Sequence, residues 1–231
     1  MRIGIPLETK SGESRVAATP ETVKKLITAG HSLIIQSHAG VKASIIDEAF
    51  TAAGATIGSA TEVFNCDIVL KVRAPSDDEL NQMRPGTVLI GMLDPFDSAT
   101  INAMAGKQIT AFALEAAPRT TRAQSMDVLS SQANIAGYKA VMLAANTYQR
   151  FMPMLMTAAG TVKAARVLIL GAGVAGLQAI ATAKRLGAVI EASDVRPAAK
   201  EQIESLGAKF VDVPFETEEE KEIAKGVGGY A

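Results

Sequence analysis

Histidine, cysteine and tryptophan are scarce in this chain, and their scarcity excludes several kinds of active site. The 231 residues include two histidines, His31 and His38, one cysteine, Cys66, and no tryptophan. A single thiol forms neither an internal disulfide nor a thiolate metal cluster. We therefore expect no metal site and no catalysis that depends on histidine. His38 is expected in a surface loop, and Cys66 is expected to be a small buried hydrophobe.

An excess of charge of either sign is also lacking. Lys and Arg number 23 against 24 Asp and Glu, which gives a net charge of −1, and no basic run appears. We therefore expect no nucleic-acid partner. The N-terminus, Met1-Arg2, is charged too early for a signal peptide, so a cytosolic or similarly reducing compartment is expected.

One long stretch, residues 167–183, carries no charge, but it is slightly short for a membrane span and is interrupted by glycines. Its first part, 167–170, is wholly apolar, which predicts a strand buried on both sheet faces. Gly171, Gly173 and Gly176 follow in the order G-x-G-x-x-G and lead into a predicted helix, 178–186. In a dinucleotide site such glycines allow a tight turn, the approach of a pyrophosphate and close helix–strand packing. The helix N-terminus then favours the phosphates.

A second predicted strand, Val189–Ser193, ends at Asp194, about twenty residues after the glycines, where an acid bonds the ribose hydroxyls. Asp194 favours NAD over NADP because a carboxylate repels a 2′-phosphate. Arg196, two residues further along the chain, argues in the other direction, because a nearby arginine accommodates that phosphate in NADP sites. Asp194 also has the alternative role of helix N-cap ahead of Pro197. The predicted cofactor-binding residues here are Gly171, Ala172, Gly173, Val174, Gly176, Asp194, Val195 and Arg196.

The first half of the chain alternates between short apolar runs and helix-forming runs. We predict strands at residues 2–5, 32–36, 68–72, 87–93 and 108–114, and helices at 20–29, 45–53 and 98–104. This alternation is typical of parallel βαβ units, so the fold class is α/β. Residues 1–125 are expected to form a flavodoxin-like parallel-sheet domain, 126–150 a linking helix that begins near an N-cap at Ser125, and 151–231 part of a Rossmann domain.

The second domain is expected to be only the first half of a doubly wound sheet. After a loop that contains Gly160 and the nucleotide-binding strands, only a strand at 209–213 and a charged helix at 216–225 remain, whereas a complete domain has about six strands. Met152, Met154 and Met156 alternate before the loop, and we interpret them as core filling rather than as a partner-facing surface.

Several motifs occur together in an order that resembles a known family. They are RVAATP from Arg15, KVRAP from Lys71, RTTRAQSMDVLSSQANIAGY from Arg119, GAGVAG from Gly171 and ASDVR from Ala192. The chain resembles, over its whole length, the NAD(H)-binding component of proton-translocating NAD(P) transhydrogenases, whose fold is shared with alanine dehydrogenase.

The resemblance implies a function and an assembly. Hydride would pass between NAD(H) on this chain and NADP(H) on a partner domain, coupled to proton translocation. The implied partners are the membrane domain, the NADP(H)-binding domain or beta subunit, and a second copy in a homodimer. The implied location is peripheral, on the cytoplasmic side of the inner membrane, with no transmembrane segment in this chain.

The resemblance also assigns site residues. Arg119, Gln124, Asp127 and Ser130 match the family's nicotinamide-contacting loop, although on spacing alone this segment reads equally well as an interdomain hinge. Tyr230 matches the tyrosine of a mobile loop that closes over the nucleotide. The chain stops inside that loop, and the missing half of the sheet would leave the apolar edge of the strand 167–170 exposed. The truncated chain is therefore expected to be poorly soluble or self-associated, and to lack transhydrogenase activity even with its partners supplied.

Two other functions stay open. The first is an amino-acid oxidoreductase like alanine dehydrogenase, whose substrate-carboxylate ligands match Arg15 and Lys71; however, that family's histidine is replaced here by Leu93-Asp94-Pro95. Many transhydrogenases keep the same two cations, so these residues discriminate poorly between the two functions. Lys71 is also interpretable as a solvated lysine at a strand end. The second is a non-catalytic, truncated nucleotide-binding fragment.

Overall fold

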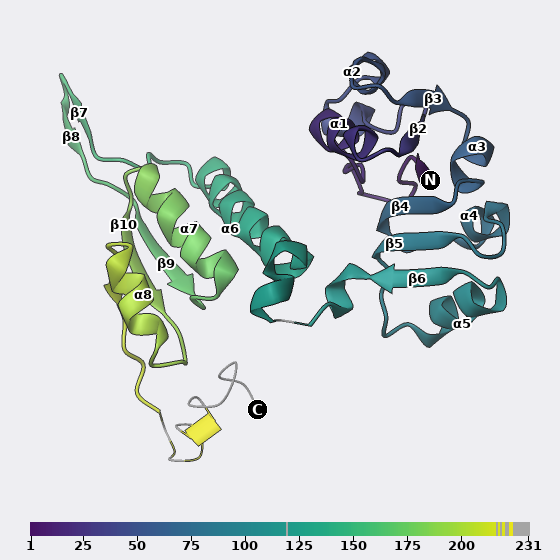
Figure 1. Cartoon of the computed structure of the whole chain (residues 1–231). Helices are drawn as coiled ribbons and strands as arrows, with labels where there is room; N and C mark the ends of the chain where they lie inside the picture. The colour runs from purple at the N-terminus through teal and green to yellow at the C-terminus, as the bar shows by residue number, and fades with distance from the viewer. Residues whose placement is uncertain (119, 216, 218, 220–221, 224–231) are drawn as a thin grey trace. The chain divides into compact units, whose positions relative to one another are not determined.

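The chain folds into two compact units, Met1–Asp127 and Val128–Ala231. The structure is a computed structural model and describes residues 1–118, 120–215, 217, 219 and 222–223 (Figure 1). Most of the predicted charged helix at 216–225, as well as Arg119 and Tyr230, lies outside the described residues. Among the described residues, no helix is both long enough and apolar enough to cross a bilayer.

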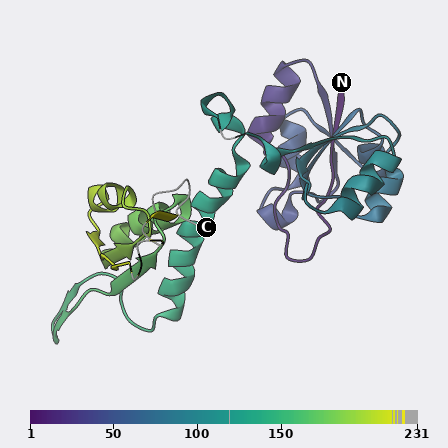
Figure 2. The same cartoon turned by 90° about the horizontal axis from the view of Figure 1, so that it is seen from below.

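The first unit is built on one parallel sheet with helices on both faces (Figure 2). Its strands are β1 Arg2–Ile5, β2 Ser32–Gln36, β3 Thr56–Gly58, β4 Ile68–Arg73, β5 Val88–Met92 and β6 Thr110–Ala113, in the order β3-β2-β1-β4-β5-β6. The order differs from that of flavodoxin because the chain adds β3 outside β2 before it returns past β1. The carboxyl ends of β1 and β4 therefore lie at a topological switch point.

The helices of this unit are α1 Pro20–Thr28, α2 Asp47–Ala52, α3 Ala60–Phe64, α4 Asp77–Gln82 and α5 Ser98–Gly106. Apart from α2, they begin at side-chain caps. The predicted start of α1 is confirmed, since Thr19 Oγ1 accepts the N–H of Thr22 at 3.3 Å. The prediction missed β3, α3 and α4. Capping boxes at the starts of α3 and α4 are visible in the sequence as Ser-x-x-Glu and are the signal that would have found both helices.

The second unit contains a long helix, a hairpin and a three-stranded parallel sheet. In chain order these are α6 Val128–Thr147, β7 Leu155–Thr157, β8 Gly160–Val162, β9 Arg166–Leu170, α7 Val174–Arg185, β10 Val189–Ser193, α8 Ala199–Ser205 and β11 Lys209–Phe210. The sheet has the order β11-β10-β9. The predicted α/β fold with a parallel sheet in each part is confirmed.

Two boundary predictions near α6 and the hairpin are wrong. Ser125 is not the N-cap of the long helix, because it lies within the 3-10 helix η3 Thr121–Met126 and α6 begins at Val128. The predicted loop around Gly160 is the antiparallel hairpin β7–β8, which projects beyond the sheet in Figures 1 and 2. Gly160 makes the turn possible because its φ of 127° is in the region that favours glycine.

The prediction that β9 is buried on both faces is also wrong. Val167 and Ile169 pack on the core beneath α7, but Leu168 and Leu170 point the other way and are 58% and 78% exposed. In the described part of the chain, β9 is the edge strand and has β10 as its neighbour.

The three alternating methionines before β8 do not share one environment. Met152 belongs to the core of the second unit, as predicted. Met154 and Met156 are exposed, the latter at 81%, so core filling is wrong for both. They lie just before and within β7 of the projecting hairpin.

Candidate nucleotide-binding site

The turn between β9 and α7 has the geometry that its three glycines predict. Gly171 has a φ of 89°, which a side chain would strain. A Cβ on Gly176 would lie 1.8 Å from the carbonyl oxygen of Gly171, so only glycine allows the helix to pack so closely on the turn. A Cβ on Gly173 would meet nothing within 4 Å. The backbone at Gly173 is therefore open to a ligand.

The first turn of α7 faces this open backbone. Gly173 is the N-cap residue, and no side chain of the described residues caps the helix. The first helical hydrogen bond runs from Leu177 N–H to Gly173 O at 2.9 Å. The N–H groups ahead of it and the positive end of the helix dipole suit an anion such as a pyrophosphate.

Asp194 lies directly against this turn although it is about twenty residues further along the chain. Its Oδ2 accepts the backbone N–H of Ala172 at 2.6 Å. The carboxylate is also bound by Arg196, whose Nε lies 2.9 Å from Oδ1. Burial raises the pKa of Asp194, but the hydrogen bonds from Arg196 and Ala172 outweigh it, so the pKa lies below its usual value. The side chain is thus an ionised carboxylate at the rim of the glycine turn.

The alternative role of Asp194 as an N-cap is wrong. The helix after Asp194 is α8, which begins at Ala199 with Ala198 as its N-cap residue, and Pro197 lies in the turn before it. Val195 separates Asp194 from Arg196 and is exposed.

The helix α6 packs tightly across the start of α7, side by side with it in Figures 1 and 2. A Cβ on Gly137 would lie 2.1 Å from the carbonyl oxygen of Ala175, so the two backbones touch there. Asn134 Nδ2 donates to Gln178 Oε1 at 3.2 Å close by. Sequence reasoning missed this crossing, for which a glycine in the middle of a long helix is the only signal.

The residues matched to the nicotinamide loop are divided between the units. Gln124 is exposed in η3, and Asp127 is the last residue of the first unit. Ser130 lies in the first turn of α6, in the same unit as the glycine turn. Arg119 and Tyr230 lie outside the described residues.

A second charged cluster lies at the switch point of the first unit. Lys71 Nζ is 3.0 Å from Glu79 Oε1 and 3.4 Å from Glu8 Oε2, and the lysine side chain is only 1% exposed. The interpretation of Lys71 as a solvated lysine is therefore wrong. Beside it, the side chain of Arg15 donates to Glu13 and, with a contribution from Arg73, lowers the pKa of Glu13 to about 2 against the effect of burial.

Three further positions were singled out in the sequence. Cys66 is fully buried, and its Sγ donates to Glu62 O at 3.4 Å, which confirms the prediction of a buried hydrophobe. His38 is exposed in a loop, as predicted. Asp94, in the segment Leu93-Asp94-Pro95, has a φ of 53°, and its N–H donates to Glu115 Oε1 at 2.7 Å. Within the described ranges, no three His, Cys, Asp or Glu side chains are grouped to hold a metal.

Comparison with known proteins gives matches over both units. The family model "Alanine dehydrogenase/PNT, N-terminal domain" matches residues 4–136, and the corresponding C-terminal domain matches residues 140–229. The first part of the divided NAD(P) transhydrogenase subunit alpha of Rhodospirillum rubrum is 52% identical over 239 residues, with all of this chain and 62% of that protein covered. An alanine dehydrogenase of Bilophila wadsworthia is 34% identical over 213 residues, which cover 89% of this chain and 55% of the relative.

Solved structures agree with these matches. A transhydrogenase from Sinorhizobium meliloti superposes with a TM-score of 0.89 at 52% identity, covering 97% of this chain and 67% of the other. An L-alanine dehydrogenase superposes with a TM-score of 0.80 at 27% identity, covering 96% of this chain and 62% of the other. The chain spans about three fifths of the length of the curated relative from Rhodospirillum rubrum.

Proposed function

Because the chain belongs to the alanine dehydrogenase/PNT family, we propose that it is the NAD(H)-binding component of a proton-translocating NAD(P) transhydrogenase. The observation that carries the proposal is the contact of the Asp194 carboxylate with the N–H of Ala172 inside the glycine turn. This contact supports the proposal because it brings together the acid proposed to bind the ribose and the turn proposed to bind the pyrophosphate.

The residues present suit a dinucleotide. The open backbone at Gly173 and the uncapped start of α7 would receive the pyrophosphate, and Asp194 would receive the adenosine ribose. NAD(H) supplies the hydride chemistry when bound. The chain's own residues then have to bind, orient and exclude water, since transfer between two nicotinamides needs no protein acid or base. This requirement is consistent with the absence of histidine from the described site.

Cofactor choice tests the proposal directly. We expect calorimetry to give tighter binding of NADH than of NADPH, because the ionised Asp194 faces the 2′ position. Asp194→Ala removes the carboxylate and should narrow that preference. Equal affinities for both cofactors in the unmutated chain would contradict the assignment.

We further propose that Arg119, Gln124, Asp127 and Ser130 orient the nicotinamide and that Tyr230 closes over the nucleotide. The support is the match of these positions to the family's motif. In an assembly reconstituted with the remaining parts of the enzyme, Gln124→Ala and Asp127→Ala should slow hydride transfer about ten- to a hundredfold with little change in adenosine affinity. If single-turnover rates were unaltered in both variants, the segment would be a hinge rather than a part of the site.

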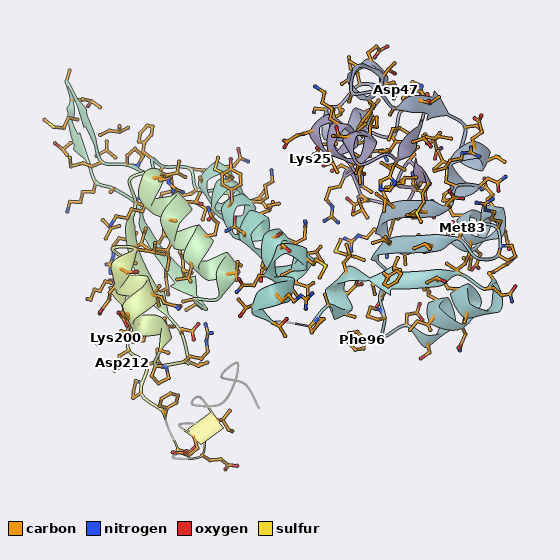
Figure 3. All side chains as sticks on the ribbon, viewed as in Figure 1. Lys25, Asp47, Met83, Phe96, Lys200 and Asp212 are labelled. Atoms are coloured by element: carbon orange, nitrogen blue, oxygen red, sulfur yellow. The ribbon has the colours of Figure 1, made fainter. Side chains whose placement is uncertain are left out.

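The proposed partners are a membrane domain, an NADP(H)-binding component and a second copy of this chain, with the complex peripheral to the cytoplasmic side of the inner membrane. The name of the Rhodospirillum rubrum relative, which describes it as the first part of an alpha subunit, supports an assembly of several parts. Exposed apolar side chains support partner surfaces on both units, including Ile135 and Leu143 on α6 and Phe96, labelled in Figure 3.

An alanine-dehydrogenase-like activity is the second candidate, favoured by the matched positions of Arg15 and Lys71 at one end of the sheet. Two observations weigh against it. Lys71 is already paired with two buried glutamates. The segment Leu93-Asp94-Pro95, matched to the place where that family has a proton-accepting histidine, contains none. NADH oxidation that depends on pyruvate and ammonia would identify this activity, and we expect none. If the chain were a non-catalytic nucleotide-binding module, it would bind NADH, but adding it to the remaining parts of the enzyme would not increase the rate of hydride transfer.

A further inference from the structure

The carboxylate of Asp194 has all its usual hydrogen-bond positions filled by the chain itself. Oδ1 accepts the backbone N–H of Arg196 at 2.8 Å and its Nε–H at 2.9 Å. Oδ2 accepts the N–H of Ala172 at 2.6 Å and Nη2 of Arg196 at 3.1 Å. A carboxylate offers about four lone-pair positions. A ligand hydroxyl can therefore bond to Asp194 fully only after one of these donors has left.

The donors that are able to leave are those of the Arg196 side chain. The other two are backbone N–H groups, one in the glycine turn and one just after β10. Arg196 is also the solvent-facing member of the pair, with a side chain that is 34% exposed against 3% for Asp194. Any ribose that reaches the carboxylate must compete with the guanidinium.

We propose that Arg196 determines cofactor specificity: in the free chain its guanidinium occupies the hydrogen-bond positions of Asp194 that would bind the ribose. We call this arrangement the latch. An unmodified adenosine ribose displaces the guanidinium, whereas a 2′-phosphorylated ribose draws it onto the phosphate. The inference rests on the proposed function, since it takes the Asp194 side of the turn as the adenosine ribose site.

The charges explain why the latch acts in opposite directions on the two ligands. The Asp194–Arg196 pair has a net charge of zero, so a 2′-phosphate meets a neutral pair rather than a bare carboxylate. A guanidinium also binds phosphate through two parallel hydrogen bonds. For a ribose without phosphate, the same guanidinium is only a competitor. Arg196 therefore reduces the preference for NAD that Asp194 creates.

The test measures the binding of two nicotinamide-free probes, ADP-ribose and 2′-phospho-ADP-ribose, to the whole chain by calorimetry. We expect Arg196→Ala to bind ADP-ribose about tenfold more tightly and 2′-phospho-ADP-ribose about tenfold more weakly, as expected for one charge-assisted hydrogen bond lost or released. Arg196→Lys keeps the positive charge but loses the paired donors, so its affinity for the 2′-phosphorylated probe should fall between those of the unmutated chain and Arg196→Ala.

A matched control removes the same charge elsewhere in the unit. Arg185→Ala lies at the opposite end of the twelve-residue helix α7 from the glycine turn and should change neither affinity more than about twofold. If Arg196→Ala left the ratio of the two affinities unchanged, whether or not both became weaker, the latch would be overturned and Arg196 would be a structural residue. If the unmutated chain bound neither probe, the nucleotide site itself would be contradicted, and the latch with it.

Discussion

Gly137 is a residue at which one added methyl group should disturb the packing of two helices in the second unit. It lies in the middle of α6, where an ideal Cβ would be 2.1 Å from the carbonyl oxygen of Ala175, 2.8 Å from its carbonyl carbon and 3.0 Å from its Cα. All three are backbone atoms at the start of α7, so no side-chain rotation relieves the contact. Gly137→Ala must separate the two helices.

The expected change in the free energy of unfolding for Gly137→Ala follows from two opposing effects. Alanine is the better helix former and would stabilise an exposed helix by about 1 kcal/mol relative to glycine. Ordinary van der Waals contact begins at 3.4 Å, so the helices must move apart by roughly 1 Å at the crossing. Overpacking of this kind costs about 1–3 kcal/mol, and the separation also weakens the hydrogen bond between Asn134 and Gln178. We expect a net loss of about 1–2 kcal/mol in the free energy of unfolding.

The sequence provides a probe that reports this unit selectively. The chain has no tryptophan, and its three tyrosines, Tyr138, Tyr148 and Tyr230, all lie in the second unit. When urea unfolding is monitored by tyrosine fluorescence, Gly137→Ala should have its midpoint at a lower urea concentration than the unmutated chain. Far-UV circular dichroism, by contrast, reports the unfolding of both units together.

A matched control is available in the first unit. Gly106 is the last residue of α5, and a Cβ there would meet nothing within 4 Å. Gly106→Ala should leave the tyrosine transition unchanged and the dichroism transition unchanged or slightly raised. If Gly137→Ala raised the tyrosine midpoint or left it where it is, the close helix crossing would be refuted.

Two further predictions concern the charged cluster of the first unit. Lys71→Met should destabilise the chain by about 3–5 kcal/mol in urea unfolding, because it strips two buried carboxylates of their cation. Adding Glu79→Gln should recover part of that loss. The pKa of Glu13 is lowered from 4.5 to about 2, so its contribution to stability is complete above about pH 5 and is lost as the pH falls toward 2. Glu13→Gln should therefore be less stable than the unmutated chain at pH 7, and the difference should shrink toward zero as the pH falls through about 2. A constant difference across that range would contradict the assignment.

The features that sequence reasoning predicts correctly here depend on neighbours along the chain. The start of α1 needs Thr19 and Pro20, and the nucleotide turn needs Gly171 and Gly176, whose roles follow from backbone geometry within six residues. Such signals act before the tertiary structure is known.

The failures concern contacts between distant residues. An apolar run such as 167–170 indicates two-sided burial only if both faces of the strand are covered, and in the described residues α7 covers one. The environment of Lys71 depends on Glu8, which is 63 positions away, so the residues around Lys71 give no sign that it is buried. Met154 and Met156 are misplaced for a similar reason, since an alternating pattern does not reveal that a hairpin leaves the core.

Asp194 combines both kinds of information. Its distance from the glycines predicts a position beside the turn, but Pro197 favours an equally local role as a helix cap, and the sequence alone does not decide between them. The structure decides because α8 begins at Ala199, too late for Asp194 to cap it. The carboxylate then turns back to Ala172, and Arg196 is close enough to close over it. Two residues that favour opposite cofactors when taken singly therefore act as one pair, and the cofactor preference depends on how readily that pair opens.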